Sequence, residues 1–149
     1  MGDMNENLII ENNKLVAFKL PEHVTIPEGV TSIGDEAFYN SHNLISVTIP
    51  EGVTRIGKYA FNWCSRLESI IIPDGVTSIG RYAFKDCLAL KSLIIPDSVT
   101  SIGDFAFFNL ARLTSIRLPK KFQSGKFIHR IGLHVYQGYC PADPIRIYE

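Results

Sequence analysis

Long apolar runs, an excess of one charge and an ample supply of cysteine are all missing from this chain of 149 residues. No window approaches the roughly 18 consecutive apolar residues that a membrane-spanning helix requires, so no membrane span is predicted. Lysine and arginine together number 15, as do aspartate and glutamate, which argues against a general nucleic-acid binder because such proteins need a basic surplus. The 3 cysteines allow one disulfide bond at most and exclude a disulfide-stapled miniprotein.

The motifs of common enzyme classes are missing as well. The chain contains no glycine-rich phosphate loop, no paired-carboxylate cleft and no credible catalytic triad, so we predict that it is not an enzyme and uses no cofactor or metal. Residues 1–6 are polar and acidic and carry neither a basic region nor an apolar core, so they predict no signal peptide. The native compartment is left open.

The chain does contain an internal repeat of 23 residues. The segment Ile-Pro-Glu-Gly-Val-Thr-Ser-Ile-Gly at 26–34 returns three times at this interval with small changes, and so do the Ala-Phe pair at 37–38 and Leu44. Such a period predicts a solenoid, in which each repeat forms one coil and buries its apolar face against the next coil. The four full copies span 26–48, 49–71, 72–94 and 95–117.

Each repeat carries the features of one such coil. In residues 46–49 polar and apolar side chains alternate, which predicts a half-buried strand with Val47 and Ile49 pointing inward. Pro50 cannot donate to a strand ladder and ends the strand, and we predict a type I turn over 49–52.

The second half of each repeat is expected to bring the chain back. Residues 53–56 predict a second short extended segment on the opposite wall. Gly57 and its equivalents at positions 34, 80, 103 and 132 are expected to supply a bend with positive φ. The stretch that begins at Ala60 and Phe61 is long enough for one or two helical turns but not for a long helix.

Both ends of the chain depart from the repeat, as the end units of a solenoid must in order to cover their apolar faces. Residues 1–25 predict an N-terminal capping unit, with a hairpin-like turn between 8–10 and 15–18. Residues 118–149 predict a degenerate fifth repeat and a C-terminal cap.

The degenerate fifth repeat aligns with the others only after an insertion. Residues 128–136 align with 53–61 once about six extra residues are allowed, and residues 120–126, which hold the insertion, predict a protruding basic loop. Residues 145–147 predict a closing strand. Because this end of the chain is basic, the molecule is expected to be dipolar, with an acidic N-terminal end.

The repeat pattern Ile-Pro-(Asp/Glu)-Gly-Val-Thr-x-Ile-Gly-x-x-Ala-Phe-x-x-Cys-x-x-Leu-x-x-Ile resembles the leucine-rich repeats of the BspA type, also called the Treponema pallidum class. The match is close over 26–117. The resemblance implies an α/β repeat solenoid, a short and strand-rich stack of leucine-rich-repeat coils with little regular helix. Members of the family are commonly cell-surface or secreted proteins of bacteria and some protists, implicated in adhesion and aggregation. The resemblance therefore implies a protein partner and a surface or secreted location.

The expected binding surface is the concave side of the stacked strands. If Val47 and Ile49 point inward, the residues between and beside them face solvent. Two isoleucines bordered by serines and a terminal arginine make a small apolar strip that suits a protein partner, although β-branched residues also suit sheet positions without any ligand. The predicted partner-binding residues are Ser46, Thr48, Ser69, Ile71, Ser92, Ile94, Ser115 and Arg117.

Self-association is the alternative function. It would use the imperfect ends of the stack or a second, convex surface built from aromatic side chains, some of which are expected to pack against the next coil instead. These aromatic residues are Tyr39, Tyr59, Trp63, Tyr82, Phe105 and Phe108.

A row of acidic side chains is expected at the turn that follows each proline. Carboxylates about 5 Å apart favour a cation or a basic partner. Acidic residues are also ordinary in turns, and no calcium-type spacing is present, so a solvated edge is the favoured interpretation. The column contains Glu28, Glu51, Asp74 and Asp97, and Lys120 ends it.

The cysteines predict structural rather than catalytic roles. Cys64 and Cys87 occupy the same repeat position, where small or apolar residues predict buried free thiols, with a disulfide between neighbouring coils as the less favoured alternative. A metal or nucleophile site made of Cys140, His129 and His134 is the remaining alternative, but the spacing matches no zinc pattern and no acid or oxyanion element accompanies it.

Overall fold

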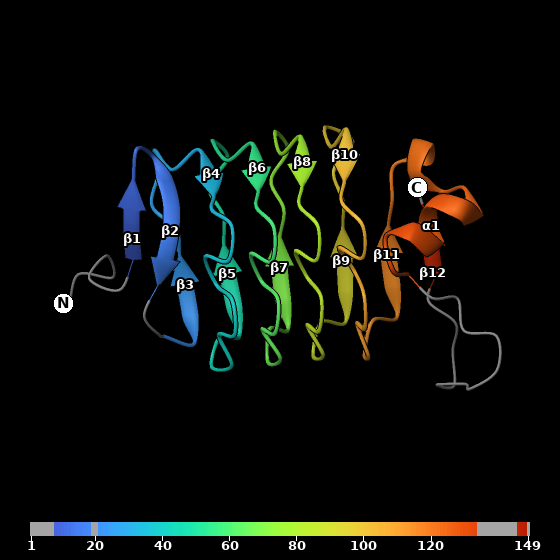
Figure 1. The fold of residues 1–149 in the computed structure, drawn as a ribbon, viewed down its shortest axis with the longest axis horizontal. Coiled ribbons are helices and arrows are strands. Elements are labelled where there is room, and N and C mark those ends of the chain that lie inside the picture. The colour runs from blue at the N-terminus through green and yellow to red at the C-terminus, as the bar shows by residue number, and fades with distance from the viewer. Residues whose placement is uncertain (1–7, 19–20, 134–145, 149) are drawn as a thin grey trace.

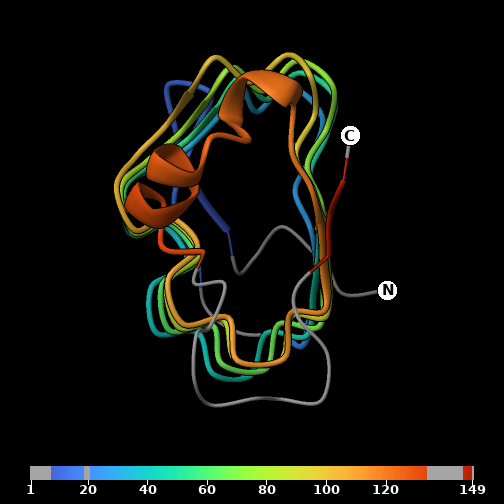
Figure 2. The same cartoon turned by 90° about the vertical axis from the view of Figure 1, so that its right-hand side faces the viewer.

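The 23-residue repeat folds into successive coils, each stacked on the one before (Figure 1). This computed structural model describes residues 8–18, 21–133 and 146–148. Viewed along the stack, the coils superpose on one common outline (Figure 2). The fold is a strand-rich solenoid with little helix, as the repeat predicts.

The three-residue strands of successive coils form one wall of the solenoid, built from two parallel sheets of three strands each, β3-β5-β7 and β9-β11-β12, and among these described strands β7 and β9 are not paired. In the three-residue strands β3, β5, β7, β9 and β11 the middle residue is buried, which confirms the predicted inward direction of Val47. Ile49 is buried as well. We call the outer surface of this wall the strand face. Its strands are β3 (His23–Thr25), β5 (Ser46–Thr48), β7 (Ser69–Ile71), β9 (Ser92–Ile94), β11 (Ser115–Arg117) and β12 (Arg146–Tyr148).

Strand β12 extends the wall at its C-terminal end. It pairs in parallel with β11, so that Tyr148 lies beside Arg117. The predicted closing strand at 145–147 is therefore present as β12, and its first predicted residue lies outside the described residues.

Shorter strands form a second wall, and their sheet continues into the N-terminal end of the stack. There β2 (Lys14–Phe18) pairs in parallel with the two-residue strand β4 (Ser32–Ile33), and β1 (Leu8–Glu11) pairs antiparallel with β2. Asn12 and Asn13, with positive φ, make the turn between them, which confirms the predicted hairpin. The two-residue strands are β4 (Ser32–Ile33), β6 (Arg55–Ile56), β8 (Ser78–Ile79) and β10 (Ser101–Ile102), and they confirm the second extended segment of each repeat.

The core consists of columns in which each side chain meets its own equivalent in the next coil. The phenylalanine column is an example, because its four rings are buried and stack with centroids 4.9, 5.2 and 5.9 Å apart. Aromatic stacking of this kind adds to the free energy gained from removing the rings from water. The column contains Phe38, Phe61, Phe84 and Phe107.

The turn after each three-residue strand lies one residue later than predicted. The N–H of Val53 donates to the carbonyl of Pro50 at 3.2 Å, so Glu51 and Gly52 are the central residues and the predicted turn at 49–52 is wrong. Ile49 and Pro50 are both buried. The chain therefore stays on the core through these residues and turns only where its side chains reach solvent.

The glycines that follow the second wall do not have the predicted positive φ. Among the described glycines, only those at positions 29, 75 and 132 have it. A Cβ built on Gly80 would lie 2.5 Å from the backbone nitrogen of Lys58 and 2.6 Å from the carbonyl carbon of Gly57. Glycine is required here because the backbone of the preceding coil passes against it. The positions at which the prediction is wrong are Gly34, Gly57, Gly80 and Gly103.

The stretch around each Ala-Phe pair contains tight turns, and the one or two helical turns predicted from the pair onward are absent from its described copies at 35–42, 58–65, 81–88 and 104–111. Tyr59 and Trp63 have φ of 55° and 61°, which interrupts a right-handed helix. The N–H of Phe61 donates to the carbonyl of Ala83 in the next coil at 2.7 Å. The N–H groups of Tyr59 and Trp63 likewise donate to carbonyls of the next coil, so they are not available for a helix. We call the surface formed by these copies the turn wall.

Residues 120–126 do not form the predicted protruding loop. A 3-10 helix, η1 (Lys120–Phe122), and a short α-helix, α1 (Gly125–Arg130), fold back onto the end of the stack. Ser124 caps α1 by accepting the N–H of Phe127. The rings of Phe122 and Phe127 stack 4.8 Å apart, and Phe122 is buried. The apolar residues within the insertion turn it into a cover for the last coil.

The predicted alignment of 128–136 with 53–61 is also wrong within the described residues. The carbonyl of Ile131 accepts the N–H of Phe107 at 2.9 Å, as the carbonyl of Ala106 accepts that of Phe84. Ile131 therefore stands in the row of Ala106 and not in that of Ile56. Residues 134–136 lie outside the described part.

Replacing Phe61 with alanine is expected to lower the free energy of unfolding by about 3–5 kcal/mol, because a buried ring that stacks on two neighbours is lost. Urea denaturation followed by circular dichroism measures the change. Phe61→Leu retains most of the buried volume and should cost less. An alanine variant with the midpoint of the parent would contradict the inward position of this ring.

Replacing Gly80 with alanine is expected to destabilise the protein by about 1–3 kcal/mol, because the new methyl group would overlap the backbone of the preceding coil. Gly52→Ala is the matched control, since its Cβ would lie at an ordinary 3.6 Å from the Val30 carbonyl oxygen. The same denaturation experiment compares them. Equal effects at the two positions would exclude close approach as the reason for glycine.

Candidate functional site

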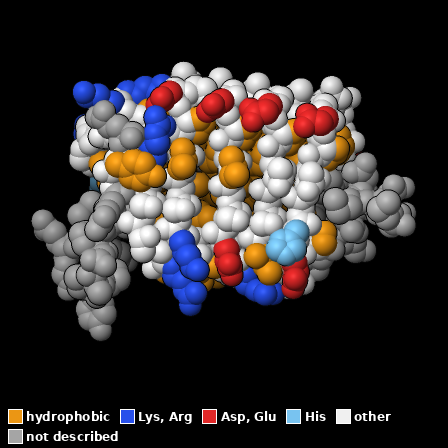
Figure 3. Space-filling view, turned by 180° about the vertical axis from the view of Figure 1, so that it is seen from behind, with side chains coloured by type: hydrophobic (Ala, Val, Ile, Leu, Met, Phe, Trp, Pro, Cys, Tyr) orange, Lys and Arg blue, Asp and Glu red, His pale blue; other side chains and the backbone are white. Residues whose placement is uncertain are grey.

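The third residues of the three-residue strands form a row across the strand face. Because the strands pair in register, Ile71 lies beside Thr48, and Ile94 lies beside Arg117. The exposed fractions of Ile71, Ile94 and Tyr148 are 79%, 56% and 44%. Figure 3 shows exposed hydrophobic side chains in a row across this face. We call the row the strip, and it contains Thr25, Thr48, Ile71, Ile94, Arg117 and Tyr148.

A second row, of serines, borders the strip. The predicted residues Ser46, Ser69, Ser92 and Ser115 begin their strands and are exposed or half-buried. At the N-terminal end of the row, Nδ1 of His23 lies 2.8 Å from Oγ of Ser46. Because these serine side chains are short, the neighbouring isoleucine side chains stay exposed to solvent.

The guanidinium of Arg117 is bound within the chain. It donates to both carboxylate oxygens of Asp97, at 3.1 and 3.2 Å, and to the carbonyl of Ile95 at 3.1 Å. Both contacts with the carboxylate come from one nitrogen, Nη2, and with the bond from Nη1 to Ile95 they hold the side chain in place and match its charge. Arg117 therefore closes the acidic row at this end of the face.

The acidic row lies along one edge of the strand face. Its carboxylates occupy the exposed turns of successive coils, where Figure 3 shows the acidic side chains in a line. Asp97 is paired with Arg117, but Glu28, Glu51 and Asp74 form no ion pair with any residue of the described part. Nor do three or more potential metal ligands converge anywhere in that part. The row is an edge with three unmatched negative charges.

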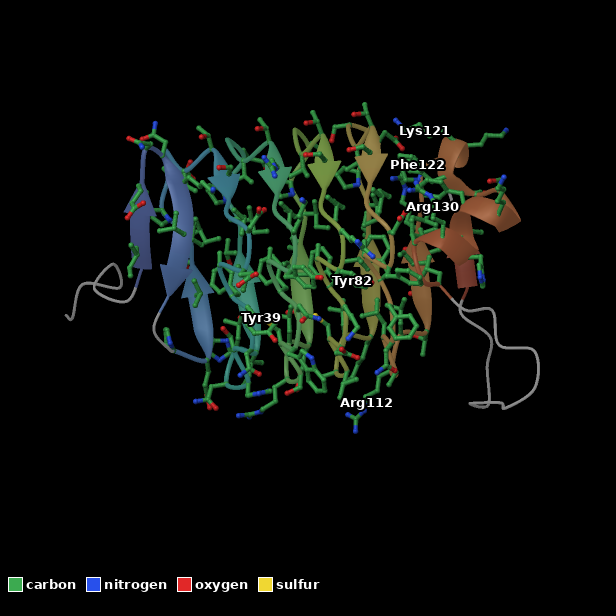
Figure 4. The ribbon with its side chains drawn as sticks, in the orientation of Figure 1. Tyr39, Tyr82, Arg112, Lys121, Phe122 and Arg130 are labelled. Carbon is green, nitrogen blue, oxygen red and sulfur yellow. The ribbon has the colours of Figure 1, made fainter. Side chains whose placement is uncertain are left out.

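Aromatic side chains gather on the turn wall, which Figure 4 shows with Tyr39 and Tyr82 labelled. The rings of Tyr59, Tyr82 and Phe105 stack in a column with centroids 5.0 and 5.6 Å apart. The guanidinium of Arg81 lies 4.7 Å from the Tyr82 ring. Stacked rings cover one another's faces, so this column contributes mainly to contact between coils and presents its edges to solvent.

An ion pair on the turn wall was missed by the sequence reasoning. The carboxylate of Asp86 is buried, forms a salt bridge with Lys85 and accepts a hydrogen bond from the side-chain amide of Asn109 at 2.7 Å. The ammonium of Lys85 lies near the rings of Trp63 and Phe108, at 5.8 and 5.9 Å from their centroids. These groups come from three successive coils, and no motif within one repeat indicates that they meet.

The thiols of Cys64 and Cys87 are free and buried, as predicted. They donate to the carbonyls of Phe38 and Phe61, at 3.1 and 3.2 Å. Burial raises the pKa of Cys64 to about 12 and raises that of Cys87 as well. Both thiols are therefore protonated and unreactive near neutral pH.

The alternative site made of cysteine and histidine is not assembled by the described residues. His129 lies exposed on α1, while Cys140 and His134 lie outside the described part. Among the described residues, no helix combines the length and the apolar character that crossing a membrane requires.

Comparison with known proteins connects the repeat to a family. The sequence profile of the BspA type leucine rich repeat region (6 copies) matches residues 9–130. None of the curated proteins compared matches the chain.

Several solved structures share the fold of this chain, among them the following three. The leucine-rich repeat protein of T. pallidum is 29% identical, with a TM-score of 0.56 over 71% of this chain and 63% of that one. The pneumococcal vaccine antigen PcpA is 29% identical, with a TM-score of 0.68 over 74% and 30%. A leucine-rich cell surface protein from Faecalibacterium prausnitzii is 25% identical, with a TM-score of 0.54 over 74% and 42%. The chain thus spans less than two thirds of each of these proteins.

A thiol reagent is expected to leave Cys64 and Cys87 unmodified in the folded protein near pH 8, because burial raises their pKa and keeps both thiols protonated. A Cys140→Ser background isolates the two thiols, and mass spectrometry with and without urea measures the labelling. Rapid labelling without urea would contradict the buried position.

The raised pKa of Cys64 also predicts how stability depends on pH. The free energy of unfolding should be constant below the ordinary thiol pKa of 9.0 and should fall between pH 9 and about 12, because the thiol of the unfolded chain ionises first.

Proposed function

Because the chain belongs to the BspA-type leucine-rich-repeat family, whose members are generally protein-interaction modules, we propose that it is a non-enzymatic recognition module that binds a protein through its strand face. The observation that carries the proposal is the exposure of Ile71 and Ile94 in adjacent coils. The contact residues would be Ser46, Thr48, Ser69, Ile71, Ser92, Ile94, Ser115 and Arg117, to which the structure adds Tyr148 as a neighbour of Arg117.

The strip has the composition of a small interface centre. Covering a fully exposed isoleucine contributes about 1.5–3 kcal/mol, and a few such side chains supply most of the affinity in many complexes. The serines beside Ile71 and Ile94 are short and do not shield them. An open apolar strip suits contact with another macromolecular surface, whereas chemistry on a small molecule needs an enclosed site.

An adhesion-type role at the cell surface is the setting we propose for this recognition. The cell surface protein from F. prausnitzii that shares the fold supports it. Self-association through the ends or the turn wall is the second candidate, favoured by the exposure of Ile9 on β1 and of Tyr39 on the turn wall.

The double variant Ile71→Ser/Ile94→Ser is expected to lose the partner, because the centre of the proposed interface is removed while both side chains point to solvent and the core is untouched. Quantitative pull-down from the native source compares it with the parent, after melting curves show that it is folded.

The matched control is Ile9→Ser/Tyr39→Ser, which removes two exposed apolar side chains from the end and the turn wall. It should retain the partner. A partner kept by the strand-face variant and lost by this control would move the interface away from the strand face, and loss of a second copy in the control would favour self-association.

A further inference from the structure

The strip and the acidic row lie next to each other on one face, and together they restrict the chemistry of a partner. We propose that the strand face binds a basic amphipathic helix, with apolar side chains over the strip and lysine or arginine side chains over the acidic row. This inference rests on the proposed function, since it names the partner of the same surface. Figure 3 shows both rows on that face.

The charge of the partner follows from the ion pairs of the face. In the turn after the Ile94 strand, Asp97 is matched by Arg117. Asp74, in the turn after the Ile71 strand, and Glu51, one coil before it, have no cationic partner among the described residues. An acidic partner would be repelled by the two unmatched carboxylates. A partner with cations on the corresponding flank would satisfy the unmatched carboxylates and gain a faster association rate.

The conformation of the partner follows from the spacing of the coils. Paired strands lie about 4.8 Å apart, so Ile94, Arg117 and Tyr148 follow one another at this spacing, and Ile71 lies one coil before Ile94. A helix that lies along the stack presents an apolar side chain once per turn, about every 5.4 Å. This repeat is close to the spacing of the coils, so apolar side chains of the helix can face successive residues of the strip from Ile71 to Tyr148. An extended chain repeats its face about every 6.6 Å and falls out of step sooner.

A second copy of this chain fits the strand face less well. Its described helix with basic residues is α1, of 6 residues, which spans only about 9 Å. The strip from Ile71 to Tyr148 covers three coil steps, or about 14 Å. The exposed lysines of η1, among them Lys121, lie at the C-terminal end of the stack (Figure 4) and do not flank an apolar face of helical length.

A model peptide tests the inference directly. The probe is a fluorescent peptide of leucine and lysine, about 18 residues long, with the leucines on one helical face. It is compared with a peptide in which glutamate replaces lysine and with one of scrambled order. Fluorescence anisotropy against the full chain is expected to show binding of the first peptide only, and added salt is expected to weaken it.

Two double variants identify the surface. Ile71→Ser/Ile94→Ser should weaken binding of the basic peptide by about tenfold or more. Glu51→Gln/Asp74→Asn should weaken it by about fivefold and reduce its dependence on salt. The matched control, Glu11→Gln/Glu36→Gln, removes the same charge from two exposed carboxylates away from the strand face and should change the affinity by less than about twofold.

The inference would be overturned by equal binding of the basic and acidic peptides, by equal loss in the control variant, or by no binding of the basic peptide. A dimer of the parent that dissociates in Ile71→Ser/Ile94→Ser would make a second copy the occupant and would overturn it too. The proposed function is judged separately. If the native partner is still lost in that variant while the basic peptide does not bind, the strand face is the recognition surface and only the assigned partner chemistry is wrong.

Discussion

Contact between one coil and the next is the interaction on which the whole structure depends. A single coil has no core of its own, because its inward side chains are covered only by the coils on either side. The strand ladders hold neighbouring coils about 4.8 Å apart, which is the thickness of one layer of side chains. Each inward residue therefore meets its own equivalent, as the stacked rings of Phe38, Phe61 and Phe84 do.

The same spacing also explains why particular residue types recur from coil to coil at positions without stacked rings. Where the backbones approach most closely, even a methyl group does not fit, and glycine repeats at 34, 57, 80 and 103. Where a small inward volume remains, Cys64 and Cys87 fill it and donate to carbonyls of the preceding coil. The core thus selects residue types by the space between coils, and it leaves the outward positions under little restriction.

Outward positions become rows for the same reason, with one residue from each coil. Thr25 and Thr48 begin the strip, and Ile71 and Ile94 continue it, although all four strands have the same backbone arrangement. The surface can therefore change from polar to apolar between neighbouring coils without a change in the fold. On the proposed function, the specificity of the protein depends on this short outward series and on the acidic row beside it.

Residue spacing along the chain was enough to predict the 23-residue period, the inward columns, the strand wall, the N-terminal hairpin and the buried state of Cys64 and Cys87. It also indicated the residues of the strip, though their role as a binding surface is a proposal. Conformations that depend on a neighbouring coil could not be predicted from the sequence and became apparent in the folded chain. Trp63 adopts a positive φ where a helix was predicted, Gly80 is set by the backbone of Lys58, and residues 125–130 form a helix that covers the last coil. The hydrogen bonds and contacts that select these conformations join residues about one repeat apart, and no local pattern within a single repeat describes them.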